Sequence, residues 1–196
     1  MCSESEARRI IGSDGAEQLI EIIQGGWKEY IKDGRARRST PRANVVWDNM
    51  MDLAESGFAA RDDVRIVPRN QSQAFVLKER LLLQFKLLDQ NFRPRNIQTR
   101  TRQRLAESGY FDDMPEDLAV VTCGYRLDAT ESEIRTIRAV RHVNNALEWS
   151  IDLEELAAGV LAPASPIFED IDPGVAVPRA LPTIRPQRRR EEGDQG

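Results

Sequence analysis

An arginine-rich segment is the feature of this sequence whose residue types most directly suggest a chemistry. Residues 90–106 contain no aspartate or glutamate, but they contain Arg93, Arg95, Arg100, Arg102 and Arg104. The planar guanidinium group of arginine matches phosphate oxygens in pairs, and a surface without carboxylates does not repel a phosphate backbone. The segment therefore predicts a surface that binds nucleic acid.

Residues around this segment fit the same interpretation. Phe92 and Tyr110 flank it, and aromatic rings stack on unpaired bases. A second basic cluster, offset only by Asp33, contains Arg35, Arg37, Arg38 and Arg42, and the first three of these arginines extend the predicted surface. The predicted function is that of a non-enzymatic accessory or regulatory protein that contacts nucleic acid.

Two other interpretations of the same arginines remain open. The arginines can form a solvated helix face that pairs with the acidic residues 112–117 of this chain. They can also dock an acidic surface on a partner protein or on a second copy of the chain. The oligomeric state and the choice between DNA, RNA and protein stay open at this point.

A short motif in the middle of the chain supports an enzymatic alternative. Gln84, Phe85 and Lys86 lie on a predicted strand, and the order of helix, three strands, helix and strand resembles the core of PD-(D/E)XK nucleases. The resemblance implies a metal-dependent nuclease, active or degenerate, in which Gln84 and Lys86 form the active strand and Glu29 is the acid of the first helix. The preceding strand, 74–77, lacks the aspartate that such a metal site needs, which favours a protein without catalytic activity.

A second resemblance covers about a quarter of the chain. The motifs QFK (84–86), RNxxT (95–99) and GYxLD (124–128) resemble those of an uncharacterised group of bacterial proteins connected with mobile elements and regulatory clusters. The resemblance implies a bacterial or phage origin and no particular activity.

Composition narrows the class of protein. The chain has 196 residues, 31% of them charged, and a net charge of −4, so any basic surface is local. The two cysteines and the acidic, polar start predict a cytoplasmic protein, and no apolar run approaches the length of a membrane span. One histidine and the lack of a glycine-rich phosphate loop predict no metal site and no cofactor.

Hydrophobic periodicity predicts the elements that position these residues. Three-and-four spacing indicates helices over 14–31 and 40–56, with the glycine pair 25–26 as a place where the first helix breaks. Short apolar runs indicate strands over 64–67, 74–77, 80–88 and 118–127, and 97–107 is predicted as an inserted basic helix. Residues 133–143 and 149–153 are predicted strands on either side of an Asn-Asn turn.

The predicted fold class is α+β: two N-terminal helices and a mostly antiparallel sheet of five or six strands with the inserted basic helix. Six of the ten prolines follow residue 161. The predicted organisation is a flexible N-terminus over 1–12, a single domain over 13–161 and a flexible, proline-rich tail over 162–196.

Overall fold

The computed structural model describes residues 2–34, 39–69, 72–95 and 118–159, all within a compact unit that spans Met1–Ala164. The predicted basic helix 97–107 and the predicted tail 162–196 lie outside the described residues. The same holds for Arg35, Arg37, Arg38, Arg100, Arg102 and Arg104.

The predicted α+β class is confirmed, because two helices are followed by a six-stranded sheet. The strands lie side by side in chain order, and every neighbouring pair is antiparallel except β3 and β4. Their bounds are β1 Val64–Arg69, β2 Ser72–Leu77, β3 Leu81–Leu87, β4 Ala119–Leu127, β5 Ile134–Val143 and β6 Ala146–Asp152.

The parallel pairing of β3 and β4 determines where the loops after them lie. Leu81 is paired with Ala119 at the start of the two strands, and Leu87 with Tyr125 near their ends. Parallel neighbours end at the same edge of a sheet. The loop that follows β3 and the turn that follows β4 therefore lie next to each other.

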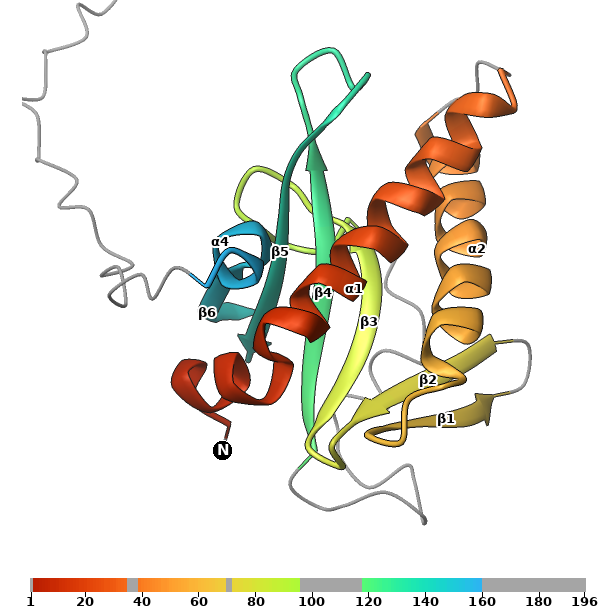
Figure 1. Cartoon of the computed structure of the whole chain (residues 1–196). Helices are drawn as coiled ribbons and strands as arrows, with labels where there is room; N and C mark the ends of the chain where they lie inside the picture. The colour runs from red at the N-terminus through yellow and green to blue at the C-terminus, as the bar shows by residue number, and fades with distance from the viewer. Residues whose placement is uncertain (1, 35–38, 70–71, 96–117, 160–196) are drawn as a thin grey trace, which may run out of the picture. The chain divides into compact units, whose positions relative to one another are not determined.

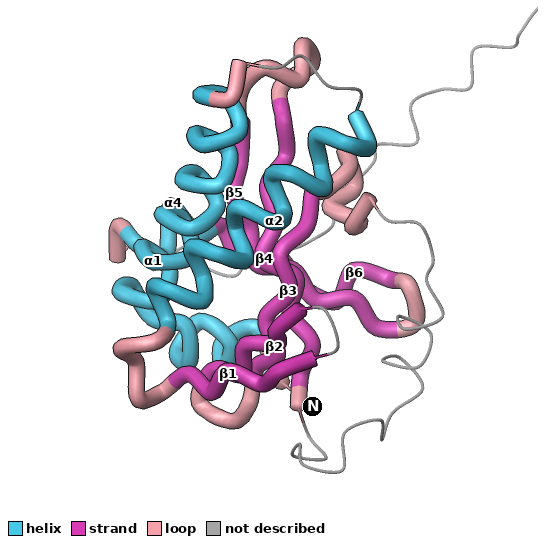
Figure 2. The backbone as a smooth tube through the Cα atoms, turned by 90° about the vertical axis from the view of Figure 1, so that its right-hand side faces the viewer, coloured by secondary structure: helices cyan, strands magenta, loops and turns pink. Residues whose placement is uncertain are grey.

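The helices α1 (Glu4–Lys32) and α2 (Ser39–Phe58) cover one face of the sheet, and the short α4 (Leu153–Ala157) packs against α1 (Figures 1 and 2). Alternate residues of the strands enter the core beneath them, as the pleat of a strand requires. Each large side chain buried there stabilises the fold by about 2 kcal/mol. The core includes Leu19, Ile23, Met50, Phe75, Phe85 and Ile137. No described helix is long and apolar enough to cross a membrane.

The structure corrects the prediction of a flexible segment over 1–12. The helix α1 begins at Glu4, and the Ser3 side chain caps it by accepting a hydrogen bond from the Glu6 backbone N–H. The carbonyl oxygen of Cys2 accepts hydrogen bonds from the side chains of Arg141 and Trp149, which are 139 and 147 residues further along the chain. These long-range bonds to β5 and β6, which local sequence does not reveal, anchor the start of the chain.

The structure also moves the predicted helix break. Gly12, with φ 65° and ψ 175°, interrupts α1, whereas Gly25 and Gly26 are helical. At Gly26 a Cβ atom would lie 2.5 Å from Met50 Cγ and 3.1 Å from the carbonyl oxygen of Val46. The glycine pair therefore allows α1 and α2 to pack closely.

The predicted Asn-Asn hairpin turn is confirmed, and a second turn of the same kind joins β2 to β3. Lys78 and Glu79 have φ values of 47° and 53°, and Asn144 and Asn145 have 49° and 67°. Two consecutive residues with positive φ, in the left-handed region, form the type of turn that matches the twist of a hairpin. The last strand ends one residue earlier than predicted, because Asp152 accepts hydrogen bonds from the N–H groups of Glu154 and Glu155 and so starts α4.

Candidate nucleic-acid interface

A pocket of about 370 Å³ lies at the edge of the sheet where β3 and β4 end. Both of the loops brought together by the parallel pairing contribute to it. Three arginines and three acidic residues are among the residues that line it: Arg95, Arg126, Arg135, Asp89, Asp128 and Glu131. What this pocket prefers to bind depends on which of these charges are already neutralised by the protein.

The loop after β3 is organised by Asp89. Its Oδ1 atom accepts hydrogen bonds from the backbone N–H groups of Asn91 and Arg93, both at 2.8 Å. The Asp89 N–H in turn donates to the carbonyl oxygen of Arg93 at 2.9 Å. An aspartate that binds the backbone two residues ahead favours a tight turn. The loop then returns to the sheet, where the Arg95 N–H donates to the carbonyl oxygen of Leu87 at 2.8 Å.

The turn after β4 is organised by Asp128 in the same way. Its Oδ1 atom accepts hydrogen bonds from the backbone N–H groups of Ser132 at 2.8 Å and Glu133 at 3.1 Å. Its Oδ2 atom accepts from the hydroxyl groups of Thr130 and Ser132. These hydrogen bonds, led by that from Thr130, hold the pKa of the Asp128 carboxyl well below its usual range. Asp128 is therefore a structural acceptor within its own turn.

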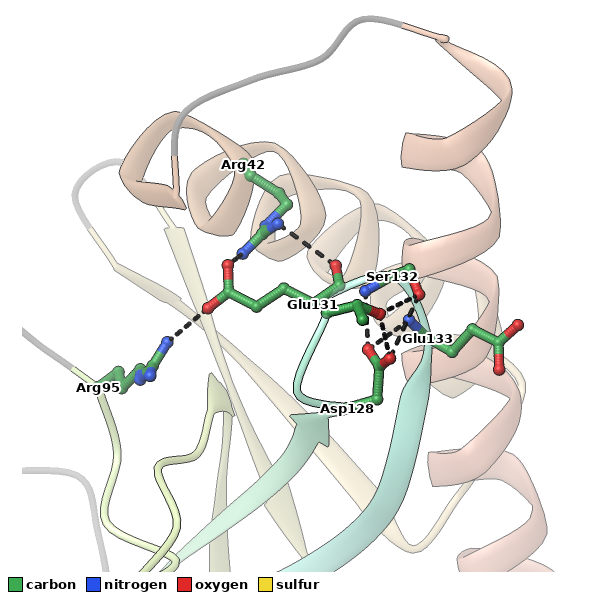
Figure 3. A network of polar contacts seen from close by, with 7 residues as sticks. Arg42, Arg95, Asp128, Glu131, Ser132 and Glu133 are labelled. Carbon is green, nitrogen blue, oxygen red and sulfur yellow. Dashed lines mark hydrogen bonds and ion pairs between the residues drawn. The ribbon is translucent and has the colours of Figure 1, made fainter.

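The third carboxylate, Glu131, lies between two arginines (Figure 3). Arg42 of α2 forms an ion pair with Glu131 Oε2, and Arg95 Nη1 lies 3.2 Å from Glu131 Oε1. Arg42 also donates to the carbonyl oxygen of Glu131 at 3.4 Å. The hydrogen bonds from Arg42 and then from Arg95 lower the pKa of Glu131. Both oxygens of this carboxylate are thus occupied by arginine.

Two arginines of the pocket retain unused donors. Arg126, near the end of β4, and Arg135, near the start of β5, line the pocket, and no described residue accepts a hydrogen bond from either guanidinium group. Both oxygens of Asp128 and of Glu131 already accept hydrogen bonds within the protein, and so does Asp89 Oδ1, whereas the guanidinium donors of Arg126 and Arg135 have no described acceptor. Such a site suits a ligand rich in acceptor oxygens, above all a phosphate.

An aromatic ring adjoins the pocket. The Phe92 ring lies beneath two guanidinium groups, with its centroid 5.3 Å from Arg126 Cζ and 4.8 Å from Arg138 Cζ. Arg138 is held in place by Ser150, whose hydroxyl lies 3.2 Å from Nη1, and by Asp152, whose Oδ2 lies 3.1 Å from Nη2. Arg126 therefore joins the aromatic ring to the pocket.

Of the predicted nucleic-acid-binding residues, the described part of the chain contains Arg93 and Arg95. Arg95 lines the pocket, and Arg93 is exposed in the loop before it. Arg126, Arg135 and Arg138 were not identified from the sequence. Each of them is next to apolar residues on a strand, a pattern that is typical of the solvent-facing side of a strand. The signal that was available is the aspartate that ends each of the two strands, Asp89 and Asp128.

The residues of the nuclease alternative lie elsewhere. Gln84 and Lys86 occupy the same side of β3, and Lys86 Nζ lies 5.6 Å from the centroid of the Trp47 ring. Glu29 is exposed on α1 and forms an ion pair with Lys32. Among the residues described, no group of three or more His, Cys, Asp or Glu side chains is arranged to hold a metal ion.

Comparison of the chain with protein-family models, with curated proteins and with solved structures finds no match. The geometry of the pocket is therefore the basis for a functional proposal.

Proposed function

We propose that this protein is a non-enzymatic accessory protein that binds nucleic acid, and that the pocket at the ends of β3 and β4 receives a backbone phosphate. The observation that carries the proposal is the imbalance of free donors and acceptors in this pocket. Arg126 and Arg135 have guanidinium N–H groups without a described partner, while both oxygens of Glu131 are bound by Arg42 and Arg95.

The position of Arg95 in the sequence supports the same proposal. Arg95 lines the pocket and directly precedes the stretch that carries Arg100, Arg102 and Arg104. A ligand bound at Arg95 is therefore adjacent along the chain to further arginines. Because the whole chain carries a net charge of −4, attraction of a polyanion has to come from such a local cluster.

Fluorescence anisotropy of labelled DNA and RNA across a salt series tests the proposal. We expect the binding constant to fall steeply with salt. In a plot of log binding constant against log salt concentration, each neutralised phosphate contributes a slope of about −0.9 on a duplex and about −0.7 on a single strand. The double variant Arg126→Gln/Arg135→Gln should bind more weakly, and the slope of its salt dependence should fall by the amount expected for about one to two phosphate contacts.

Arg9→Gln is the matched control. Arg9 is exposed on α1 without a described partner, and α1 begins near the edge of the sheet opposite to the end of β4 (Figure 1). This variant removes one positive charge but should leave the affinity unchanged. If neither DNA nor RNA binds at low salt, the proposal is wrong, and an acidic protein partner becomes the candidate. Cleavage of the probes in the presence of Mg²⁺, lost in Lys86→Ala, would instead support the nuclease.

A further inference from the structure

We infer that the nucleic acid bound at this site is single-stranded, with one base stacked on the Phe92 ring and a neighbouring phosphate held by Arg126 and Arg135. This inference rests on the proposed function and adds the form of the nucleic acid to it. Three features of the structure support it: the backbone conformation of Phe92, the two guanidinium groups over its ring, and the contact of Arg126 with both the ring and the pocket.

The backbone of Phe92 adopts a conformation that is costly for its side chain. Its φ of 56° lies in the left-handed region, which bulky residues rarely adopt. The hydrogen bonds of Asp89 to Asn91 and Arg93 impose this conformation, and the Phe92 N–H donates to the Asp89 carbonyl oxygen at 3.1 Å. Costly conformations of this kind cluster at functional sites, where the surrounding structure maintains them.

The left-handed conformation puts an aromatic ring where the turn itself would favour glycine or asparagine. Asn91 is the neighbouring residue and tolerates this region, but the aromatic side chain occupies the strained position. The half-buried ring of Phe92 reaches Arg126 on β4 and Arg138 on β5. The loop therefore holds the ring at a fixed place on the sheet.

An aromatic ring that packs with one face on guanidinium groups can stack on a base with its other face. Unpaired bases stack on aromatic side chains and on the planes of arginine, whatever their sequence. In a duplex, both faces of each base are covered by the neighbouring base pairs. Only an unpaired base can therefore use the Phe92 ring.

Arg126 connects the two halves of the site. It lies over the Phe92 ring and also lines the pocket that contains Arg95 and Arg135. A base on the ring and a phosphate in the pocket are consequently adjacent, as they are along a single strand. Hydrogen bonds from neutral groups leave Asp128 ionised, so the balance of charge decides how a phosphate is received: Arg42, Arg95, Arg126 and Arg135 carry four positive charges, against three negative charges on Asp89, Asp128 and Glu131.

The test compares single strands with duplexes of the same length and sequence, in DNA and RNA forms, by fluorescence anisotropy at fixed salt. We expect single strands to bind at least tenfold more tightly than the matched duplex. Phe92→Leu, which keeps an apolar side chain but removes the ring, should weaken binding of single strands by about 5- to 100-fold, the range measured when a stacked aromatic is removed. Phe92→Tyr should retain the affinity, and thermal unfolding establishes that each variant is folded.

The outcomes separate this inference from the function on which it rests. Equal or tighter binding of the duplex overturns the inference and leaves nucleic-acid binding intact. The inference is also overturned, and nucleic-acid binding left intact, if Phe92→Leu binds single strands as tightly as the unaltered protein while Arg135→Gln weakens their binding. If no nucleic acid of either form binds at low salt, the proposed function fails, and the inference fails with it.

Discussion

Arg42 on α2 and Glu131 in the β4–β5 turn are 89 residues apart in the chain and form an ion pair in the folded protein. The Arg42 side chain is only 11% exposed, so the pair is shielded from solvent on the helix side. Through this contact, α2 supports the turn that forms one wall of the pocket. The same carboxylate binds Arg95 in the loop that forms another wall.

Replacement of Glu131 by glutamine should lower the free energy of unfolding in a pH-dependent way. The pKa of Glu131 in the folded protein lies below its usual value, because Arg42 and Arg95 donate hydrogen bonds to the ionised form. The stabilisation is therefore fully present above the pKa of the unfolded chain and is lost as the pH falls through the folded pKa. Because the Glu131 side chain is 38% exposed, solvent screens the pair, and we expect a loss of about 1 kcal/mol at neutral pH.

Chemical denaturation of the Glu131→Gln variant and of the unaltered protein at pH 7 and pH 3 measures this difference. Glu133→Gln is the control, since the Glu133 carboxylate points away from the network in Figure 3 and has no described partner. A difference between the Glu131 variant and the unaltered protein that is the same size at both pH values would contradict the prediction.

Two neighbouring glycines of α1 should respond in opposite ways to alanine. At Gly26 the added methyl group would meet Met50 Cγ at 2.5 Å and the Met50 backbone nitrogen at 3.1 Å, so α1 and α2 must separate. We expect a loss of about 1–3 kcal/mol in the free energy of unfolding. At Gly25 the nearest atom is Leu53 Cδ1 at 2.7 Å, the end of a side chain that is 37% exposed and free to rotate.

Gly25→Ala should therefore be neutral or should stabilise the protein by up to about 1 kcal/mol, the difference in helix propensity. The pair of variants is compared by urea denaturation, and each is the control for the other. An equal effect of the two substitutions would mean that the helices do not cross at Gly26.

The glycines also show what the sequence alone can and cannot predict. Within the described residues, hydrophobic periodicity located the two long helices and the six strands but not the short α4, because it reports which side of each element is buried. It does not say why a glycine is present: the pair 25–26 was interpreted as a break, while the kink lies at Gly12 and the pair mediates packing. That distinction depends on Met50 and Leu53 in another helix.

The candidate site was predictable to a smaller extent. Arg93 and Arg95 stood out because they are close in sequence, whereas Arg126 and Arg135 join them only through the parallel pairing of β3 with β4. A parallel register leaves no local signature comparable to the two asparagines of a hairpin turn. The ion pair of Arg42 with Glu131 likewise depends on how α2 lies over the sheet.

The two cysteines should differ in reactivity. Burial raises the pKa of the Cys123 thiol to about 12, and its side chain is 0% exposed in the middle of β4, so it can react only when the domain unfolds. Cys2 is also buried, but it lies outside α1, next to the N-cap Ser3, and opening of the first turn of that helix suffices to expose it.

We therefore expect iodoacetamide at pH 8 to label Cys2 faster than Cys123, with the Cys123 rate set by the fraction of globally unfolded protein. Mass spectrometry of peptides taken over a time course distinguishes the two sites. Labelling of Cys123 at the rate of Cys2 under native conditions would show that β4 opens locally and would contradict the prediction.

Gly124→Ala should disturb the loop that carries Phe92. A Cβ atom at position 124 would lie 2.6 Å from Leu88 Cγ and 2.7 Å from the Lys86 carbonyl oxygen. Leu88 is the residue at which the chain leaves β3, and its N–H donates to the Tyr125 carbonyl oxygen at 2.8 Å. Because the backbone of β3 itself is in the way, we expect a loss of about 2–3 kcal/mol in the free energy of unfolding.

Displacement of Leu88 also moves the loop that begins at Asp89, so binding of single strands should weaken at least fivefold. The affinity is measured under conditions where circular dichroism shows that the variant is still folded. Thr122→Ser is the matched control: it lies two residues earlier on the same strand and face, and it removes an atom instead of adding one. We expect it to lower stability slightly and to leave the affinity unchanged. A folded Gly124→Ala variant with unaltered affinity would show that the position of this loop does not govern binding, and the Phe92 stacking surface would then have to be abandoned.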